Sequence, residues 1–217
     1  EMAGLLRFLN RDMAEARNLL DRIAFSSATV INAQHRLGLD LDGNAGGDLF
    51  LPPTIAAGRW SNPASTGNVA VTVDDVTRLA ASSYELQFDA GTGVLVTRQP
   101  SGETLPLFDY GATNPIIIDG LSFQIVTPGV SGERFLIKPF DNSASAMKSV
   151  ISSPRGLAVA DPVEPRIGIA NTGTLAVSSL TANTADPNLT TTVQLTFTGP
   201  GTFDVVGTGT GNPVGVT

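Results

Sequence analysis

The side chains that most often carry out catalysis are scarce in this sequence. It contains no cysteine and a single histidine, His35. A triad-type nucleophile needs a base, usually an imidazole, and a usual zinc site needs several cysteine or histidine ligands. His35 lies near the predicted end of a helix, where the helix dipole mildly favours a cation. We therefore interpret His35 as a structural polar residue whose replacement has little effect, and we predict no catalytic nucleophile and no zinc.

One group of oxygen ligands resembles half of a calcium site. Asp40, Asp42 and Asn44 alternate along a tight turn, as ligands do in the first half of an EF-hand loop. Ala45 stands where that loop requires glycine, and Leu51 stands where a glutamate closes the ligand shell. The sequence therefore predicts a turn between the helix and the next segment, and no calcium site.

Other polar residues give no sign of an active site. Nothing in the sequence brings the remaining carboxylate pairs together or surrounds them with apolar residues that would shift a pKa. These pairs are Asp74/Asp75, Asp141/Asn142 and Asp161/Glu164. The glycine-rich stretches lack the lysine and the strand-to-helix context of a phosphate-binding loop. We therefore predict a protein that is not an enzyme and that uses no metal and no cofactor.

The composition disfavours several classes of partner. The net charge is −7, with an isoelectric point near 4.6. Nucleic acids and anionic membrane surfaces attract clustered lysine and arginine, so we predict neither as a partner. No apolar run approaches the roughly 20 residues that span a bilayer, and the N-terminus lacks the pattern of a cleaved signal peptide. Only 15% of residues are charged, and 23 glycines and 14 prolines favour short strands joined by turns.

One long helix is predicted at the start of the chain. Residues 2–37 contain no proline, and no glycine after Gly4. Apolar residues recur there in alternating steps of four and three, the spacing of a seam in a helical bundle or coiled coil. We expect packing to depend on Leu6, Leu9, Met13, Leu20, Ile23, Val30 and Leu37. Such a seam needs apolar partners, and other long helices are the expected ones.

The rest of the chain predicts antiparallel β structure. Alternation places Tyr84, Leu86 and Phe88 on one face of a strand. Further strands are predicted at 69–73, 94–98, 116–118, 121–125, 135–139 and 191–198, with a helical turn within 143–152. The fold class is therefore α+β, mainly β, with a long N-terminal helix of the bundle or coiled-coil type followed by antiparallel β-rich modules.

Four segments follow from these patterns. The long helix and its glycine-rich turn occupy residues 1–48, and a linker occupies 49–68. An antiparallel β module spans 69–157. Residues 158–217, poor in charge and rich in threonine and glycine, form part of a second β-rich module.

The end of the helix resembles a known protein family. Asn32, His35, Gly38 and Asp40, followed by a glycine-rich turn and Phe50, have the order and spacing with which a long helix closes in the flagellar hook-associated protein 1 family. Residues 81–86, 119–121 and 132–139 look like that family's second domain, although Glu133-Arg134 stands where an Asp-x-Phe pairing is more usual. Residues 193–197 and 202–205 are similar to its later β segment.

The resemblance implies a non-catalytic structural component of the bacterial flagellum, at the junction between hook and filament. It implies export by the flagellar secretion system without a cleaved signal peptide, and an extracellular location. The implied partners are the hook protein, the other hook–filament junction protein, further copies in a ring, the export apparatus and a chaperone. Because family members polymerise through helices from both chain ends, it also implies that this chain is an internal fragment. The residues alone leave an alternative open, a surface adhesin or glycan-binding β-rich module.

Overall fold

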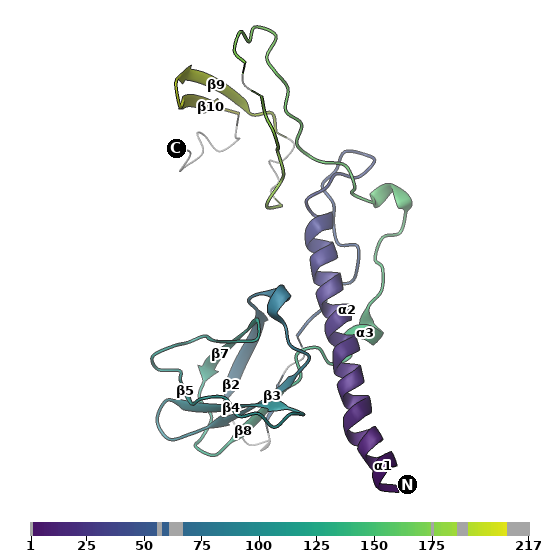
Figure 1. Cartoon of the computed structure of the whole chain (residues 1–217), viewed down its shortest axis with the longest axis vertical. Helices are drawn as coiled ribbons and strands as arrows, with labels where there is room; N and C mark the ends of the chain where they lie inside the picture. The colour runs from purple at the N-terminus through teal and green to yellow at the C-terminus, as the bar shows by residue number, and fades with distance from the viewer. Residues whose placement is uncertain (1, 56–57, 61–66, 175, 186–190, 208–217) are drawn as a thin grey trace. The chain divides into compact units, whose positions relative to one another are not determined.

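The computed structural model describes residues 2–55, 58–60, 67–174, 176–185 and 191–207 (Figure 1). The chain divides into two compact units. The first unit comprises residues 1–31 and 50–149, and the second comprises 32–49 and 150–217. None of the helices in the described part of the chain is long and apolar enough to cross a membrane. The segment boundaries predicted from composition stay predictions.

The predicted long helix is present, with one interruption of its regular winding. It consists of α1 (Met2–Arg7), the π-helical turn η1 (Phe8–Asp12) and α2 (Met13–His35). A π-helical turn takes more residues than an α-helical turn. It therefore rotates the apolar residues that precede it relative to those that follow. The seam predicted from sequence assumed one unbroken register, and that register does not continue through η1.

The β structure of the first unit forms two antiparallel sheets. A five-stranded sheet has the order β1-β8-β3-β4-β5, and a three-stranded sheet has the order β2-β7-β6. The strands are β1 (Arg59–Trp60), β2 (Asn68–Val73), β3 (Ser83–Phe88), β4 (Gly93–Gln99), β5 (Phe108–Asp109), β6 (Ile116–Ile118), β7 (Leu121–Thr127) and β8 (Arg134–Ile137). Every strand predicted between residues 69 and 139 is confirmed within a few residues of its predicted ends. β1, inside the predicted linker, and β5 are additions.

The two sheets and the helix share one apolar core. Tyr84, Leu86 and Phe88 are at most 1% exposed, which confirms the predicted alternation along β3. They pack in one cluster with Phe123 of the three-stranded sheet and with Phe25 of α2. Burying each such side chain stabilises the fold by roughly 1.5 to 3 kcal/mol. The core therefore fixes both sheets and one face of the helix.

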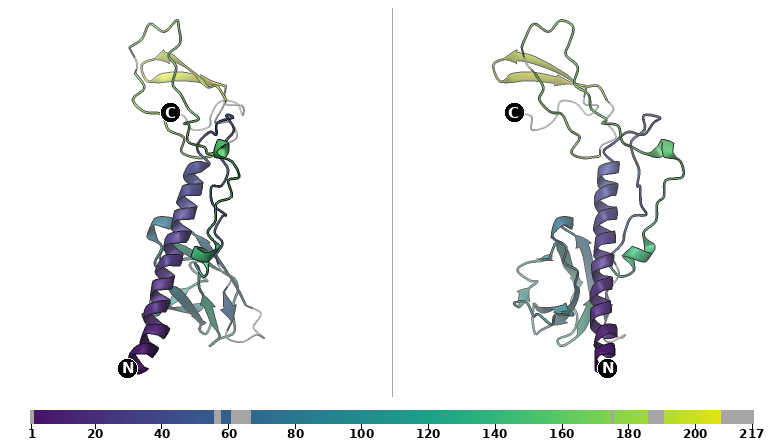
Figure 2. Two further views of the ribbon diagram at one scale, coloured as in Figure 1. Left: turned by 90° about the vertical axis from the view of Figure 1, so that its right-hand side faces the viewer. Right: turned by 45° about the vertical axis from the view of Figure 1, so that its right-hand side comes forward.

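Polar contacts complete the attachment of α2 within the first unit. Phe25 packs against Phe140 with ring centroids 5.1 Å apart. The buried carboxylate of Asp21 accepts a hydrogen bond from the backbone N–H of Ala144, at 2.8 Å, in α3 (Ser143–Ala146). Arg22 Nη1 donates to the carbonyl of Leu79, in the turn after η2 (Val76–Arg78), at 3.1 Å. Figure 2 shows the helix running beside the sheets of this unit.

The second unit contains the end of α2, the loop after it, the short helix η3 (Pro154–Gly156) and a hairpin of β9 (Gln194–Gly199) and β10 (Thr202–Val206). The hairpin confirms the strand predicted at 191–198. Phe197 lies opposite Phe203, with ring centroids 5.8 Å apart. Residues 208–217 of the predicted second module lie outside the described residues.

Candidate functional site

Four of the five family-motif residues lie together around the C-terminal end of α2. Asn32 and His35, one helical turn apart, are only 2% and 7% exposed. Asn32 Oδ1 accepts a hydrogen bond from the backbone N–H of Leu49 at 3.0 Å, so the loop after the helix folds back along it. Phe50 belongs to the first unit, where it forms a β-bridge with Ser149. We call residues 32–49 with residues 155–160 the helix-end joint.

His35 connects two backbone segments within this joint. Its Nδ1 lies 2.8 Å from the carbonyl oxygen of Gly47, and its Nε2 lies 2.9 Å from the backbone nitrogen of Ala158. A carbonyl only accepts and a backbone N–H only donates, so Nδ1 carries the proton and Nε2 accepts. The ring is neutral in this arrangement. These contacts overturn our interpretation of His35 as a residue of little consequence, because the buried ring holds two segments that are distant in sequence.

Two glycines make the close packing of the joint possible. A Cβ added to Gly38 would lie 2.5 Å from the carbonyl oxygen of Ala158. A Cβ added to Gly46 would lie 2.0 Å from the carbonyl oxygen of His35 and 2.6 Å from Ala158 Cβ. These glycines are required because backbone approaches backbone, and neither has a positive φ. The glycine of the family motif therefore has a steric role here.

Backbone pairing then fixes the segment that follows residue 155. Leu39 and Ala160 exchange two backbone hydrogen bonds, of 2.8 and 3.2 Å. The N–H of Leu41 donates to the carbonyl of Arg155 at 3.1 Å, and the Arg155 guanidinium pairs with Asp42. The joint is therefore a small three-part assembly of helix end, loop and returning segment.

The side chain of Asp40 stabilises the turn by hydrogen bonds to its backbone. Its Oδ1 accepts hydrogen bonds from the backbone N–H groups of Asn44, at 2.8 Å, and Asp42, at 2.9 Å. The bond from the Asn44 backbone is the main reason why the pKa of Asp40 is held below its usual value. Within the part of the chain that the structure describes, no group of three or more potential metal ligands gathers.

Six of the seven predicted seam residues are exposed in this chain. Leu6, Leu9, Met13, Leu20, Ile23 and Val30 are between 42% and 59% exposed, and we call them the apolar helix face. Leu37, half-buried, lies in the helix-end joint. The buried face of α2 is a different one, with Ala24, Phe25 and Ala28 at most 8% exposed. That the seam packs against other helices therefore stays a prediction about partners outside the described residues.

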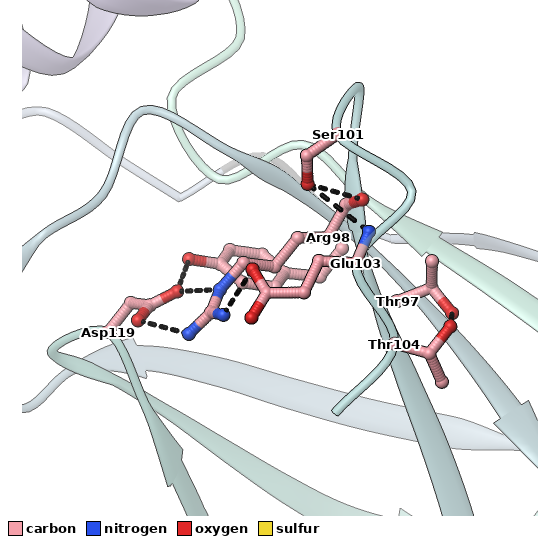
Figure 3. Close-up of polar contacts among 7 residues, drawn as sticks. Thr97, Arg98, Ser101, Glu103, Thr104 and Asp119 are labelled. Carbon is pink, nitrogen blue, oxygen red and sulfur yellow. Dashed lines mark hydrogen bonds and ion pairs between the residues drawn. The ribbon is translucent and has the colours of Figure 1, made fainter. Parts of the chain in front are cut away.

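A partly buried ion-pair network, which the sequence patterns did not reveal, ties the two sheets of the first unit together (Figure 3). Asp119 occupies the β6–β7 turn with a positive φ of 50°, followed by Gly120 at 75°. Arg98, on β4, donates to both carboxylate oxygens of Asp119 at 2.8 Å, and the hydroxyl of Tyr84, on β3, donates to Oδ2 at 2.8 Å. Glu103 also pairs with Arg98, at 2.8 Å.

The charge states in this network favour a structural contact between the two sheets, which we call the Asp119 lock, over an acid–base pair. Burial acts to raise the pKa of Asp119, but the hydrogen bonds from Arg98 and Tyr84 outweigh it, and the pKa is lowered. Burial first, and then the Asp119 carboxylate, raise the pKa of Tyr84. The Asp119 carboxylate likewise raises the pKa of Arg98. Each group is therefore held in the charge state that keeps the contact closed.

Comparison with known proteins finds similarity to one family. Residues 1–50 match the family model described as the helical domain of the flagellar hook-associated protein FlgK. Flagellar hook-associated protein 1 of Salmonella typhimurium is 32% identical over 160 residues, and that of Escherichia coli K12 is 31% identical over 162. Each alignment covers 73% of this chain and 29% of the relative.

A solved structure is similar to this chain as well. The flagellar hook junction protein FlgK from Burkholderia pseudomallei superposes with a TM-score of 0.62 and 28% identity, covering 73% of this chain and 29% of that one. The chain thus spans less than a third of the length of each of these relatives.

Proposed function

This chain is related to the flagellar hook-associated protein 1 family, and from that premise we propose that it is a structural part of the junction between the hook and the filament of a bacterial flagellum. The relatives are structural proteins of the flagellum, which supports a role without catalysis. The resemblance predicted from the sequence is confirmed over the matched part of the chain.

The observation that carries the proposal is the apolar helix face. Four of its residues, Met13, Leu20, Ile23 and Val30, lie on α2, and Leu6 and Leu9 lie before it in α1 and η1; each of the six is at least 42% exposed. Exposed apolar surface of this extent marks a site of association. The family model that matches residues 1–50 describes a helical domain. We therefore assign the face to packing against other helices of the assembly, with the sheets of the first unit as a rigid body attached to the opposite side.

The finer parts of the proposal rest on the family. They are contacts with the hook protein and the other hook–filament junction protein, association of copies in a ring, and export by the flagellar secretion apparatus with a chaperone. Export without a cleaved signal peptide and a location outside the cell belong to the same proposal. The relatives' names, hook-associated protein and hook junction protein, support a place at the hook junction, and the other parts rest on the resemblance.

A single substitution on the apolar helix face tests the proposal. Leu20→Asp is expected to change the free energy of unfolding of this chain by less than about 1 kcal/mol, because Leu20 is 59% exposed. In the full-length protein, introduced into a strain lacking its gene, the same change is expected to abolish filament attachment and motility. An aspartate enclosed between apolar helices costs several kcal/mol.

Ala14→Asp is the matched control, with the same charge change at an exposed position about 100° around the helix from Met13. It is expected to preserve motility. Electron microscopy of flagella and swarming in soft agar report both outcomes. Normal filaments in the Leu20→Asp strain would show that the apolar helix face is not an assembly surface, and normal filaments in the deletion strain would overturn the proposed function.

A further inference from the structure

We propose that the helix-end joint is an acid-sensitive contact, closed while His35 is neutral and opened when its ring takes up a second proton. The inference stands on the contacts of the joint and does not depend on the proposed function. The chain contains no second histidine, so His35 is the one imidazole on which such a response can act.

The hydrogen bonds of His35 permit one protonation state. Nδ1–H donates to the carbonyl of Gly47, and Nε2 accepts from the N–H of Ala158. A second proton would sit on Nε2 and face the N–H of Ala158, placing two donors 2.9 Å apart between their nitrogens. His35 is 7% exposed, so the two donors would meet in a largely buried position. An unsatisfied buried donor destabilises the contact, and the positive charge adds to this.

The charged groups around His35 do not remove this conflict. Asp40 and Asp48 line an open hollow beside the ring and would attract a cationic imidazole. However, Asp40 already accepts hydrogen bonds from the turn, and Asp48 pairs with Arg36. The returning segment brings Arg155, whose partner is Asp42. Asp40 and Asp48 therefore each have a backbone or cationic partner, and the hydrogen-bond partner of Nε2 is the N–H of Ala158, not a carboxylate.

Opening is expected to begin at the returning segment. Ala158 is released first, because its N–H loses the acceptor on the ring. The two backbone bonds between Leu39 and Ala160, two residues further on, are the next contacts to lose support. The bond from Nδ1–H to Gly47 survives protonation, so the loop stays on the helix end while residues 157–160 separate from it. The response is therefore local and reversible.

Amide hydrogen exchange in the intact chain tests the inference. Between about pH 8 and pH 5, where histidine changes charge, the protection factors of the Ala158 and Ala160 amides are expected to fall at least tenfold. Leu86 and Phe123, in the core of the first unit, are expected to keep their protection. The ring nitrogens, observed by NMR, are expected to report the Nδ1–H tautomer while the joint is closed and the charged ring once it has opened.

The matched variant is His35→Gln, whose amide supplies one donor and one acceptor but takes up no proton. Its Ala158 and Ala160 amides are expected to keep constant protection over the same pH range. Unchanged protection of these amides in the natural chain while the ring becomes charged would overturn the proposal. An Nε2–H tautomer at the alkaline end, or an equal loss of protection in His35→Gln, would overturn it as well.

Discussion

Replacement of Asp119 by asparagine is expected to lower the free energy of unfolding of the first unit by about 2 kcal/mol at neutral pH. Asparagine has nearly the same shape and tolerates the positive φ of 50° at this turn, so the backbone is undisturbed. It cannot accept two charge-assisted bonds from Arg98 while also accepting from Tyr84. The change therefore removes the charge of the lock and leaves its geometry.

The same variant predicts how stability depends on pH. The pKa of Asp119 is lowered in the folded chain, so its carboxylate binds a proton less readily there than in the unfolded chain. Its contribution is complete above about pH 5, where the unfolded carboxyl is almost fully ionised, and is lost as the pH falls through the folded pKa. The difference between the natural chain and Asp119→Asn is therefore expected to be full at neutral pH and to shrink in acid.

Urea unfolding followed by circular dichroism at several pH values measures this difference. Asp141→Asn is the control, since Asp141 is exposed and undergoes the same loss of charge. It is expected to change the free energy of unfolding by less than about 0.5 kcal/mol at any pH. Equal effects of the two variants, or a difference that grows in acid, would contradict the role assigned to Asp119.

The elements were predictable where a local pattern dictates them. Two-residue alternation placed Tyr84, Leu86 and Phe88 in the core, because every second residue of a strand lies on the same face. The proline-free stretch at the start of the chain gave the helix. The apolar repeat in the same stretch predicted which residues need a packing partner. It did not show that these residues are exposed in this chain. The buried face of α2 carries small and polar residues such as Asp21 and Ala28, which no periodicity argument selects.

The tertiary contacts could not be predicted, because each depends on a register between distant segments. Arg98 and Asp119 are 21 positions apart, and His35 and Ala158 are 123 positions apart. An Asp-Gly pair between apolar runs did signal the turn at 119–120. It did not show that the carboxylate would meet an arginine of the other sheet. The family motif listed Asn32, His35 and Gly38 without giving a reason for them, and in the structure His35 and Gly38 both meet the close return of residues 155–160.

Substitution of Gly46 by alanine is expected to disrupt the helix-end joint, whereas the same substitution at the next residue, Gly47, is expected to be tolerated. The new methyl at position 46 would lie 2.0 Å from the carbonyl oxygen of His35, far inside van der Waals contact, and the clash is with backbone on a regular helix. At Gly47 nothing lies within 4 Å of the added Cβ. The pair therefore separates steric exclusion from the general effect of losing a glycine.

Overpacking against rigid backbone costs about 3 kcal/mol. For Gly46→Ala this cost is expected to appear as a lower free energy of opening at the Leu39 and Ala160 amides in hydrogen exchange, because these residues pair across the joint. Gly47→Ala is expected to leave both amides within about 0.5 kcal/mol of the natural chain. Equal protection in the two variants would mean that the loop can move away from the helix end without loss. The glycines of the joint would then serve chain flexibility, and the close approach to His35 would not be what requires them.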